Sequence, residues 1–287
     1  MVCVRVVERK KGMKSYFYLQ YSFRRDGNVV TKEKYLGIEI PKIMKEIEEE
    51  AAQEMESFVR DDLNEIKSHF QKGWKKLPDA IKEKHVQEIA VAFTYNTNAI
   101  EGSKITMRDA RDIISDGIAP RKPVRDVKET ETHAKVFLDM LLSEEKITKR
   151  LLLAWHKELF SSTKPGIAGV FRNYLIRVGS YVAPDWQDVK ELMRDLMRFV
   201  TASDNANPVE FAARVHYRFE KIHPFGDGNG RVGRLLINAM LWRAGYPMLI
   251  IEYRKRRAYY RALENDEEGF VKYFIRNYIR VHKRRGS

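Results

Sequence analysis

The stretch His-Pro-Phe-Gly-Asp-Gly-Asn-Gly-Arg-Val-Gly-Arg, residues 223–234, constrains the fold of this chain more than any other part of its sequence. Glycine takes backbone conformations that are closed to other residues, so Gly226, Gly228 and Gly230 predict a tight loop whose N–H groups turn inward. A helical period of apolar residues follows at once, and a capped helical run precedes the stretch. The sequence therefore predicts a mainly helical fold in which an anion-binding loop joins two helices.

The polar residues of this stretch have the properties that phosphate chemistry requires. His223 is the only side chain there whose ordinary pKa lets it accept a proton near neutrality, so it is the candidate general base. Asp227 would be repelled by a polyphosphate unless a hard cation lay between them, which makes it a candidate Mg²⁺ ligand. Arg231 and Arg234 share one face of the predicted helix, at the end where cations oppose its dipole. An anionic partner would remove that conflict.

The stretch resembles the signature of the Fic family, His-Pro-Phe-x-Asp/Glu-Gly-Asn-Gly-Arg-x-x-Arg, and it fills every specified position. The resemblance covers about residues 90–280 and implies a Fic-type helical bundle. Most members of the family transfer AMP from ATP to a hydroxyl group of a protein. By this resemblance His223 deprotonates the target hydroxyl and Asp227 holds Mg²⁺. The resemblance also implies a set of residues that hold the phosphates of ATP, namely Gly226, Gly228, Asn229, Gly230, Arg231 and Arg234.

A second motif, Thr97-Asn-Ala-Ile-Glu101-Gly102, ends a helix predicted over about residues 80–102. Thr97 and Glu101 lie on one helical face, and Gly102 is the predicted helix stop. A glutamate in a last turn lies at the unfavourable end of the dipole, as Arg234 does at a helix start, so the two opposite charges suggest each other as partners. The motif matches the inhibitory motif Ser/Thr-x-x-x-Glu-Gly/Asn of many Fic domains. That match implies that Glu101 pairs with Arg234 and keeps ATP out of a productive pose.

Residues 171–186 predict two short strands around Gly179-Ser180, at the position of a hairpin that is called the flap in Fic domains. In the family the flap pairs with the backbone of the target and directs its hydroxyl to the base. Val178 and Tyr181 are the candidates for that contact. Ordinary packing of these two side chains is the alternative.

Tyr259 and Tyr260 resemble a tyrosine pair that lies near the nucleotide in some relatives. One of them would stack on or bond to adenosine, with ordinary helix packing as the alternative. A family asparagine a little further on is replaced by Glu267, which leaves the nucleotide preference open.

The remaining pattern predicts a β-hairpin appendage over residues 1–42 and a helical Fic-type catalytic domain over residues 43–287. In the appendage the side chains of Phe17, Leu19, Tyr21 and Phe23 alternate onto one face, and Asp26-Gly27 supplies a hairpin turn. From Ile43 the apolar period changes to steps of three and four, which predicts helices. They are expected from Ile43 to Pro78 and at about residues 80–101, 106–117, 126–143, 149–160, 186–202, 208–221, 229–244 and 257–281.

The net charge of +13 is concentrated at the two ends of the chain. Residues 1–42 and 272–287 carry +6 each, which leaves +1 for the 229 residues between them. Solvated basic ends are favoured over a binding patch for nucleic acid. Cys3 is the only cysteine, so an intrachain disulfide and a cysteine zinc site are excluded. No apolar run is long enough to span a membrane or to form a signal peptide, so we expect a cytoplasmic protein without membrane contact.

Three functions follow from these patterns. The leading one is an autoinhibited protein adenylyltransferase that uses ATP and Mg²⁺ to modify a Ser, Thr or Tyr hydroxyl of a protein, with self-modification and a homodimer left open. The second is a Fic enzyme that removes AMP or transfers another phosphate-containing group. The third, of a different class, is a nucleic-acid or protein-binding module that uses the basic termini. His133, His156 and His216 lack metal-ligand companions at suitable spacing, so core or surface roles are expected for them.

Overall fold

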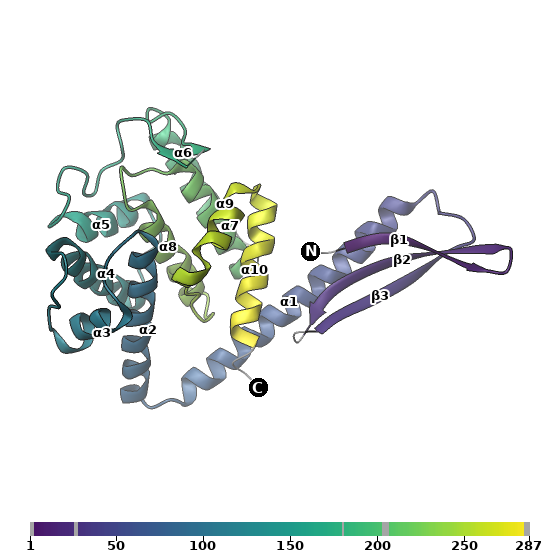
Figure 1. Ribbon diagram of the computed structural model, residues 1–287, viewed down its shortest axis with the longest axis horizontal. Helices are drawn as coiled ribbons and strands as arrows, with labels where there is room; N and C mark the ends of the chain where they lie inside the picture. The colour runs from purple at the N-terminus through teal and green to yellow at the C-terminus, as the bar shows by residue number, and fades with distance from the viewer. Residues whose placement is uncertain (1–2, 26–27, 180, 203–206, 284–287) are drawn as a thin grey trace. The chain divides into compact units, whose positions relative to one another are not determined.

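The computed structural model describes residues 3–25, 28–179, 181–202 and 207–283. Two compact units are present: residues 1–66 with 279–287, and residues 67–278. The first contains a β-sheet, and the second is built from helices apart from one short hairpin (Figure 1). The predicted fold class, mainly helical with small β elements, is confirmed. The predicted division into domains at residue 43 stays a prediction.

The smaller unit contains an antiparallel sheet in the order β1-β2-β3. Its strands are β1 (Cys3–Lys11), β2 (Lys14–Arg25) and β3 (Asn28–Gly37). The predicted hairpin corresponds to β2 and β3, but the appendage is not a hairpin alone, because β1 adds a third strand. The described side chains of β1, from residue 5 to residue 11, are mostly exposed, so no one-sided apolar pattern marks this strand in the sequence. The side chain of Phe23 and the turn predicted at Asp26-Gly27 lie outside the described residues.

One face of this sheet packs on the N-terminal part of α1, which runs Met44–Lys76. Leu19 and Tyr21 of β2 are buried there, as their alternation predicted. They meet apolar residues of α1 spaced by four, which is the stripe that an amphipathic helix presents. These residues are Ile47, Ala51 and Met55.

The larger unit is a bundle packed around α8. Along α8 apolar and polar side chains alike are buried on nearly every side, which is typical of a central helix. The helices of this larger unit include α2 (Asp79–Ile100), α3 (Met107–Asp116), α4 (Val124–Leu142), α5 (Lys149–Phe160), α6 (Val189–Thr201), α7 (Pro208–Ile222), α8 (Asn229–Arg243), a 3₁₀ turn (Tyr253–Lys255), α9 (Arg256–Glu264) and the first part of α10 (Glu267–Lys283).

The helix predicted over residues 257–281 is wrong in one respect, because the chain forms two helices there, α9 and α10. The break falls at Asn265 and Asp266. The Asp266 carboxylate accepts a hydrogen bond of 2.7 Å from the Gly269 N–H, so it caps the start of α10. Asparagine and aspartate compete in this way with the backbone bonds of a continuous helix.

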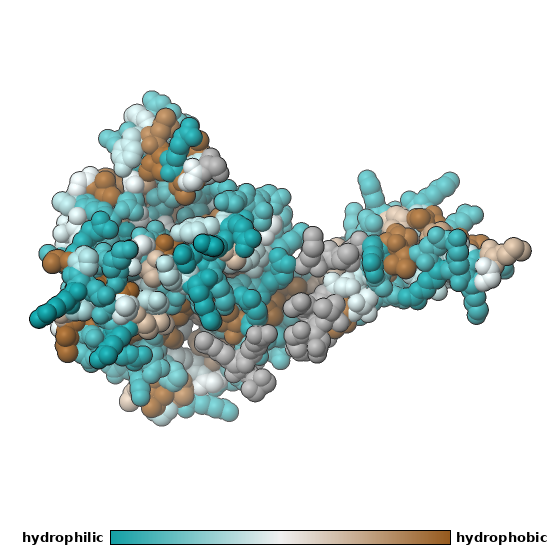
Figure 2. Space-filling view, viewed as in Figure 1, coloured by the Kyte–Doolittle hydropathy of each residue, from teal (hydrophilic) through white to brown (hydrophobic). Residues whose placement is uncertain are grey.

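Within the described residues no helix has the length and apolar character needed to cross a membrane. Figure 2 agrees with this at the surface, where hydrophilic residues cover most of the visible face and hydrophobic residues form small scattered patches.

Candidate active site

The signature stretch forms the connection between α7 and α8, as its glycines predicted. α7 starts where expected, with the Asn207 side chain accepting a hydrogen bond of 2.9 Å from the Val209 N–H and Pro208 in the first turn. His223 ends the helix with a φ of 50°, the only positive φ of a non-glycine residue in the part of the chain that the structure describes. This conformation costs a non-glycine residue about 1 kcal/mol or more, so the surrounding contacts must hold it.

The ring of His223 is oriented by the end of its own helix. Its Nδ1 lies 3.3 Å from the carbonyl oxygen of Glu220, which can only accept, so Nδ1 carries the proton and Nε2 is left as an acceptor. Burial lowers the pKa of His223 below the ordinary 6.5, against the raising effect of that carbonyl and of the Glu101 charge. The imidazole is therefore neutral at neutral pH and suited to accept a proton at Nε2.

Two buried side chains hold the loop after His223. Asn229 accepts from the Phe225 N–H and donates to the Phe225 carbonyl, both at 2.8 Å, so its amide closes the loop on itself. The ring of His156 stacks on Phe225 with centroids 3.9 Å apart, and its Nε2–H donates to the Asp227 carbonyl at 3.0 Å. Burial lowers the pKa of His156 to about 4, which keeps the ring neutral. His156 therefore has the core position that was expected, and from there it also supports the loop.

Two glycines of the signature are needed for close approaches. Gly228 precedes α8 with a φ of 79°, and a Cβ there would lie 2.3 Å from the Phe160 ring. A Cβ on Gly230 would lie 2.4 Å from Oε1 of Glu101. The first turn of α8 therefore accepts the Glu101 carboxylate only because residue 230 has no side chain.

Arg234 and Glu101, the pair that the sequence suggested, are in contact across 133 residues of chain. Nη2 of Arg234 donates to Oε1 of Glu101 at 2.5 Å and to the carbonyl of Thr97 at 3.3 Å. The arginine side chain is only 2% exposed, whereas the Glu101 side chain is 25% exposed. Gly102 has a φ of 90° directly after the end of α2, so it is the helix stop that was predicted.

Arg231 pairs with a second carboxylate, Glu129 of α4, which the sequence analysis did not identify. Both side chains are less than one tenth exposed, and the guanidinium lies over the Phe160 ring at 4.3 Å from its centroid. Glu129 also accepts from Thr163 at 3.0 Å. Its signal in the sequence was an acid on the buried face of an amphipathic helix, in step with His133 and Phe137.

Comparison with known proteins adds to this geometry. Residues 146–241 match the model of the Fic/DOC family and include the whole signature. The chain belongs to the Fic/DOC family. The protein adenylyltransferase Fic of Nematostella vectensis is 34% identical over 212 residues, which are 71% of this chain and 48% of that protein. The protein of the same name from Drosophila ananassae is 34% identical over 69% of this chain and 40% of its own length. The chain thus spans about half the length of these curated relatives or less.

Solved structures agree on the fold of this Fic protein. A Fic domain containing signaling protein from Bacteroides thetaiotaomicron superposes with a TM-score of 0.69 at 22% identity, over 77% of this chain and 94% of that one. A fragment of Fic-1 from C. elegans gives a TM-score of 0.68 at 26% identity, over 82% of this chain and 72% of that fragment.

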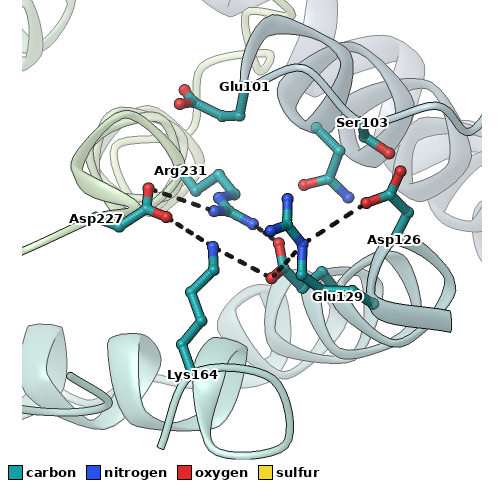
Figure 3. Close-up of a pocket in the computed structure, with 9 residues that line it drawn as sticks. Glu101, Ser103, Asp126, Glu129, Lys164, Asp227 and Arg231 are labelled. Carbon is teal, nitrogen blue, oxygen red and sulfur yellow. Dashed lines mark hydrogen bonds and ion pairs between the residues drawn. The ribbon is translucent and has the colours of Figure 1, made fainter. Parts of the chain in front are cut away.

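Asp227 of the Fic signature lies in a polar cleft of about 40 Å³ (Figure 3). Its Oδ1 accepts from the Gly228 N–H at 2.6 Å, and its Oδ2 accepts from Nζ of Lys164 at 2.6 Å. Burial opposes ionisation, but the Lys164 hydrogen bond and the charge of Arg231 outweigh it and lower the pKa of Asp227. The carboxylate is therefore ionised and partly exposed, which suits a ligand for a hard cation.

No group of three or more His, Cys, Asp or Glu side chains in the described part of the chain is arranged to hold a metal ion. A cation at Asp227 would need further oxygen ligands from phosphates and water, which is usual for Mg²⁺.

The hairpin predicted from the sequence is present as β4 (Arg177–Val178) and β5 (Tyr181–Val182), paired antiparallel, and its role as a flap stays a prediction. Ser180 of the intervening turn lies outside the described residues. Val178 is 43% exposed, so it is available to another molecule. Tyr181 instead donates from its hydroxyl to the carbonyl of Lys221 at 2.7 Å. That bond anchors the hairpin two residues before His223.

Arg172 also supports the Fic site, although no motif in the sequence marks it. Its buried guanidinium donates to the carbonyls of His223 at 2.8 Å, Tyr174 at 2.9 Å and Pro184 at 2.6 Å. Backbone carbonyls leave no trace in the residue pattern, so the sequence carried no signal for this role. The three bonds join the segment before the flap, the segment after it and the strained end of α7.

The two tyrosines of the predicted pair have different surroundings. Tyr259 is 1% exposed, and its hydroxyl lies 2.7 Å from Nε2 of the buried His216. Tyr260 is 40% exposed and reaches the Ile100 carbonyl at 3.5 Å, next to Glu101. Of the two, only Tyr260 presents surface to a ligand. The Glu267 carboxylate accepts a hydrogen bond of 2.9 Å from Nε of Arg218.

Proposed function

We propose that this protein is an autoinhibited protein adenylyltransferase, which transfers AMP from ATP to a Ser, Thr or Tyr hydroxyl of a protein. The observation that carries the proposal is the ion pair between the buried Arg234 and the partly exposed Glu101, set against Gly230 in the first turn of α8, directly after the loop that holds His223. The name shared by the curated relatives supports the same reaction, although the chain spans only part of their length.

In the proposed reaction Nε2 of His223 takes the proton of the target hydroxyl as its oxygen attacks the α-phosphorus of ATP. A bond forms between that oxygen and the α-phosphorus, the bond from the α-phosphorus to the bridging oxygen breaks, and pyrophosphate leaves. The neutral ring and its Nδ1–H bond to Glu220 fit this task, because the free nitrogen is already an acceptor.

The phosphates would lie at the start of α8, where free N–H groups and the helix dipole favour anions. Gly226, Gly228 and Gly230 leave room for the approach, and Asn229 fixes the shape of the loop through Phe225. Asp227 would hold Mg²⁺, which would neutralise phosphate charge when bound there. Arg231, held by Glu129, would present a fixed positive charge.

Inhibition would follow from competition for Arg234. While Glu101 occupies its guanidinium, this arginine is not free to bind the terminal phosphates of ATP. The nucleotide then lacks the contact that would align its α-phosphorus with the incoming hydroxyl. Release of Glu101 would therefore be the activating step.

The exposed edge of the flap at Val178 is the proposed contact for the protein target, with Tyr181 as its anchor. A strand of the target could pair there and bring its hydroxyl toward His223. The exposed Tyr260, near the end of α2, is the proposed contact for the adenosine.

The test is intact-mass spectrometry of the Glu101→Gly protein after incubation with ATP and Mg²⁺, alone and with candidate target proteins. A gain of one AMP is expected, and Glu101→Gly/His223→Ala should lose it. Glu83→Gly is the matched control, because Glu83 is an exposed glutamate of the same helix α2. No gain of AMP in Glu101→Gly on itself or on any target would sink the proposal, and a different added mass would favour transfer of another phosphate-containing group.

A further inference from the structure

A lysine occupies the space between two carboxylates of the polar cleft, those of Asp227 and Glu129, as Figure 3 shows. Nζ of Lys164 lies 2.6 Å from Oδ2 of Asp227 and 3.3 Å from Oε1 of Glu129. The lysine side chain is 19% exposed, so most of it is enclosed by protein. An ammonium group therefore bridges the proposed metal ligand and the partner of Arg231.

The position of this lysine is fixed by the turn that follows α5. The Lys164 N–H donates to the Phe160 carbonyl at 2.7 Å, and its Nζ lies over the Phe160 ring at 4.9 Å from the centroid. The neighbouring Thr163 donates to the same Glu129 carboxylate. The ammonium is thus aimed into the cleft by its own segment and does not reach it as a loose surface side chain.

The oxygen that Lys164 holds is also the one that a metal ion would need. Oδ1 of Asp227 accepts from the Gly228 N–H and lies 3.7 Å from Nη2 of Arg231, whereas among the described residues Oδ2 has only the Lys164 ammonium beside it, so Oδ2 is the more accessible oxygen for a cation once Lys164 withdraws. An ammonium at 2.6 Å and a divalent cation cannot both occupy that side of the carboxylate, since both are positive and both need the same lone pairs. Glu129 lies close enough to keep the ammonium paired after it leaves Asp227.

We propose that Lys164 is a tethered cation that competes with a divalent metal ion for Oδ2 of Asp227. The metal ion binds when the ammonium withdraws toward Glu129, and the free protein is thereby protected from holding a metal ion before its other ligands arrive. The inference rests on the proposed function only in taking Asp227 as the metal ligand.

The experiment is a titration of the nucleotide-free full chain with Mn²⁺, followed by the electron paramagnetic resonance signal of the free ion. Lys164→Met keeps the length of the side chain and removes its charge, so it should bind Mn²⁺ about tenfold more tightly than the unmodified protein. Lys164→Arg, which keeps the charge, should stay near the unmodified value. Lys157→Met is the matched control on the exposed side of α5 and should change nothing.

The double variant Lys164→Met/Asp227→Asn must lose the increase in Mn²⁺ affinity, because the proposed competition is for the Asp227 oxygen. Equal or weaker Mn²⁺ binding in Lys164→Met, no binding in either protein, or a gain that survives Asp227→Asn would each overturn the proposal. If circular dichroism shows Lys164→Met to be unfolded, Lys164→Gln takes its place in the same comparison. No nucleotide and no AMP transfer enter this measurement, so it can succeed or fail independently of the proposed reaction.

Discussion

The two arginines of the signature make two ion pairs of unequal character on one helix. Arg231 meets Glu129 in the middle of α4, with both side chains less than one tenth exposed. Arg234 meets Glu101 at the end of α2, where the glutamate is a quarter exposed and a glycine with positive φ follows. Glu129 is also held by Thr163 and Lys164, whereas Glu101 caps a helix at its unfavourable dipole end.

This difference suggests a division of labour. Glu129 is fixed by its neighbours and keeps Arg231 in place, so that pair is structural. Glu101 follows the last residue of α2, and its side chain is a quarter exposed, so a rotation of this side chain alone would release Arg234 while the buried last turn of the helix stays in place. A regulatory contact has to be drawn from the less stable part of a structure, since it must open while the rest stays folded.

The largest expected difference between the pairs is in stability. Glu129→Ala removes the hydrogen-bonded carboxylate of the buried Arg231 and leaves it, among the described residues, only Asp227 as an ion-pair partner, 3.7 Å away, so it should lower the free energy of unfolding by about 3–5 kcal/mol. Glu101→Ala should cost only about 1–2 kcal/mol, because its removal opens Arg234 to water from the cleft. Urea denaturation with an unchanged m-value would measure both. Equal losses would break the distinction.

Nucleotide affinity should change in opposite directions. Glu101→Gln releases Arg234 and should tighten ATP binding by about tenfold, because a larger fraction of the protein is then competent to bind. Glu129→Gln frees Arg231 from its fixed position and should weaken binding. Calorimetric titration in a His223→Ala background would avoid turnover. Tighter binding in both variants would show that Glu129 is a second inhibitor.

The pH dependence of AMP transfer by the activated protein should show a pKa for His223 below its ordinary range. Burial lowers the pKa of His223 below 6.5, so its acceptor nitrogen is lost only when the pH falls beneath that value. The AMP-transfer rate of Glu101→Gly should therefore be flat toward acid until below pH 6.5 and then fall. An acid limb at or above pH 6.5 would contradict the assignment of His223 in its buried state.

The smallest expected effect is a difference between the two glutamates in how much each changes the pKa of His223. The charge of Glu101 raises the pKa of His223, so Glu101→Gln should lower that pKa further. Glu129→Gln should change it less, since Glu129 is occupied by Arg231 and Lys164. Nuclear magnetic resonance titration of the His223 ring would compare the two. A larger shift in Glu129→Gln would show that the pairs are electrically coupled.

Most of the fold could be predicted because local sequence patterns indicate where its helices begin and end. Helix periods, the Asn207 cap, the Gly102 stop and the glycine loop all follow from steps of three and four and from backbone preferences. The continuous helix over residues 257–281 failed where Asp266 offered the backbone another hydrogen bond. β1 was missed because its described side chains, from residue 5 to residue 11, are mostly exposed and form no one-sided apolar pattern.

The site could be predicted only in part, for a related reason. His223 and the Glu101–Arg234 contact were identified because each lies in a motif with unusual charge placement. Glu129, Lys164 and Arg172 lie in no such motif, and all three act through neighbours far away in the chain. Nothing local distinguishes them from ordinary charged residues.

The sequence by itself determined that a base, a carboxylate and two arginines stand around a glycine loop between two helices, because backbone sterics and helix periodicity act between near neighbours. Only the tertiary structure decided which acid meets which arginine, across 102 residues for Arg231 and 133 for Arg234. It also decided that Lys164 forms an ion pair with the Asp227 carboxylate. Ionic contacts between distant segments depend on packing, which brings charges together only after the helices have assembled.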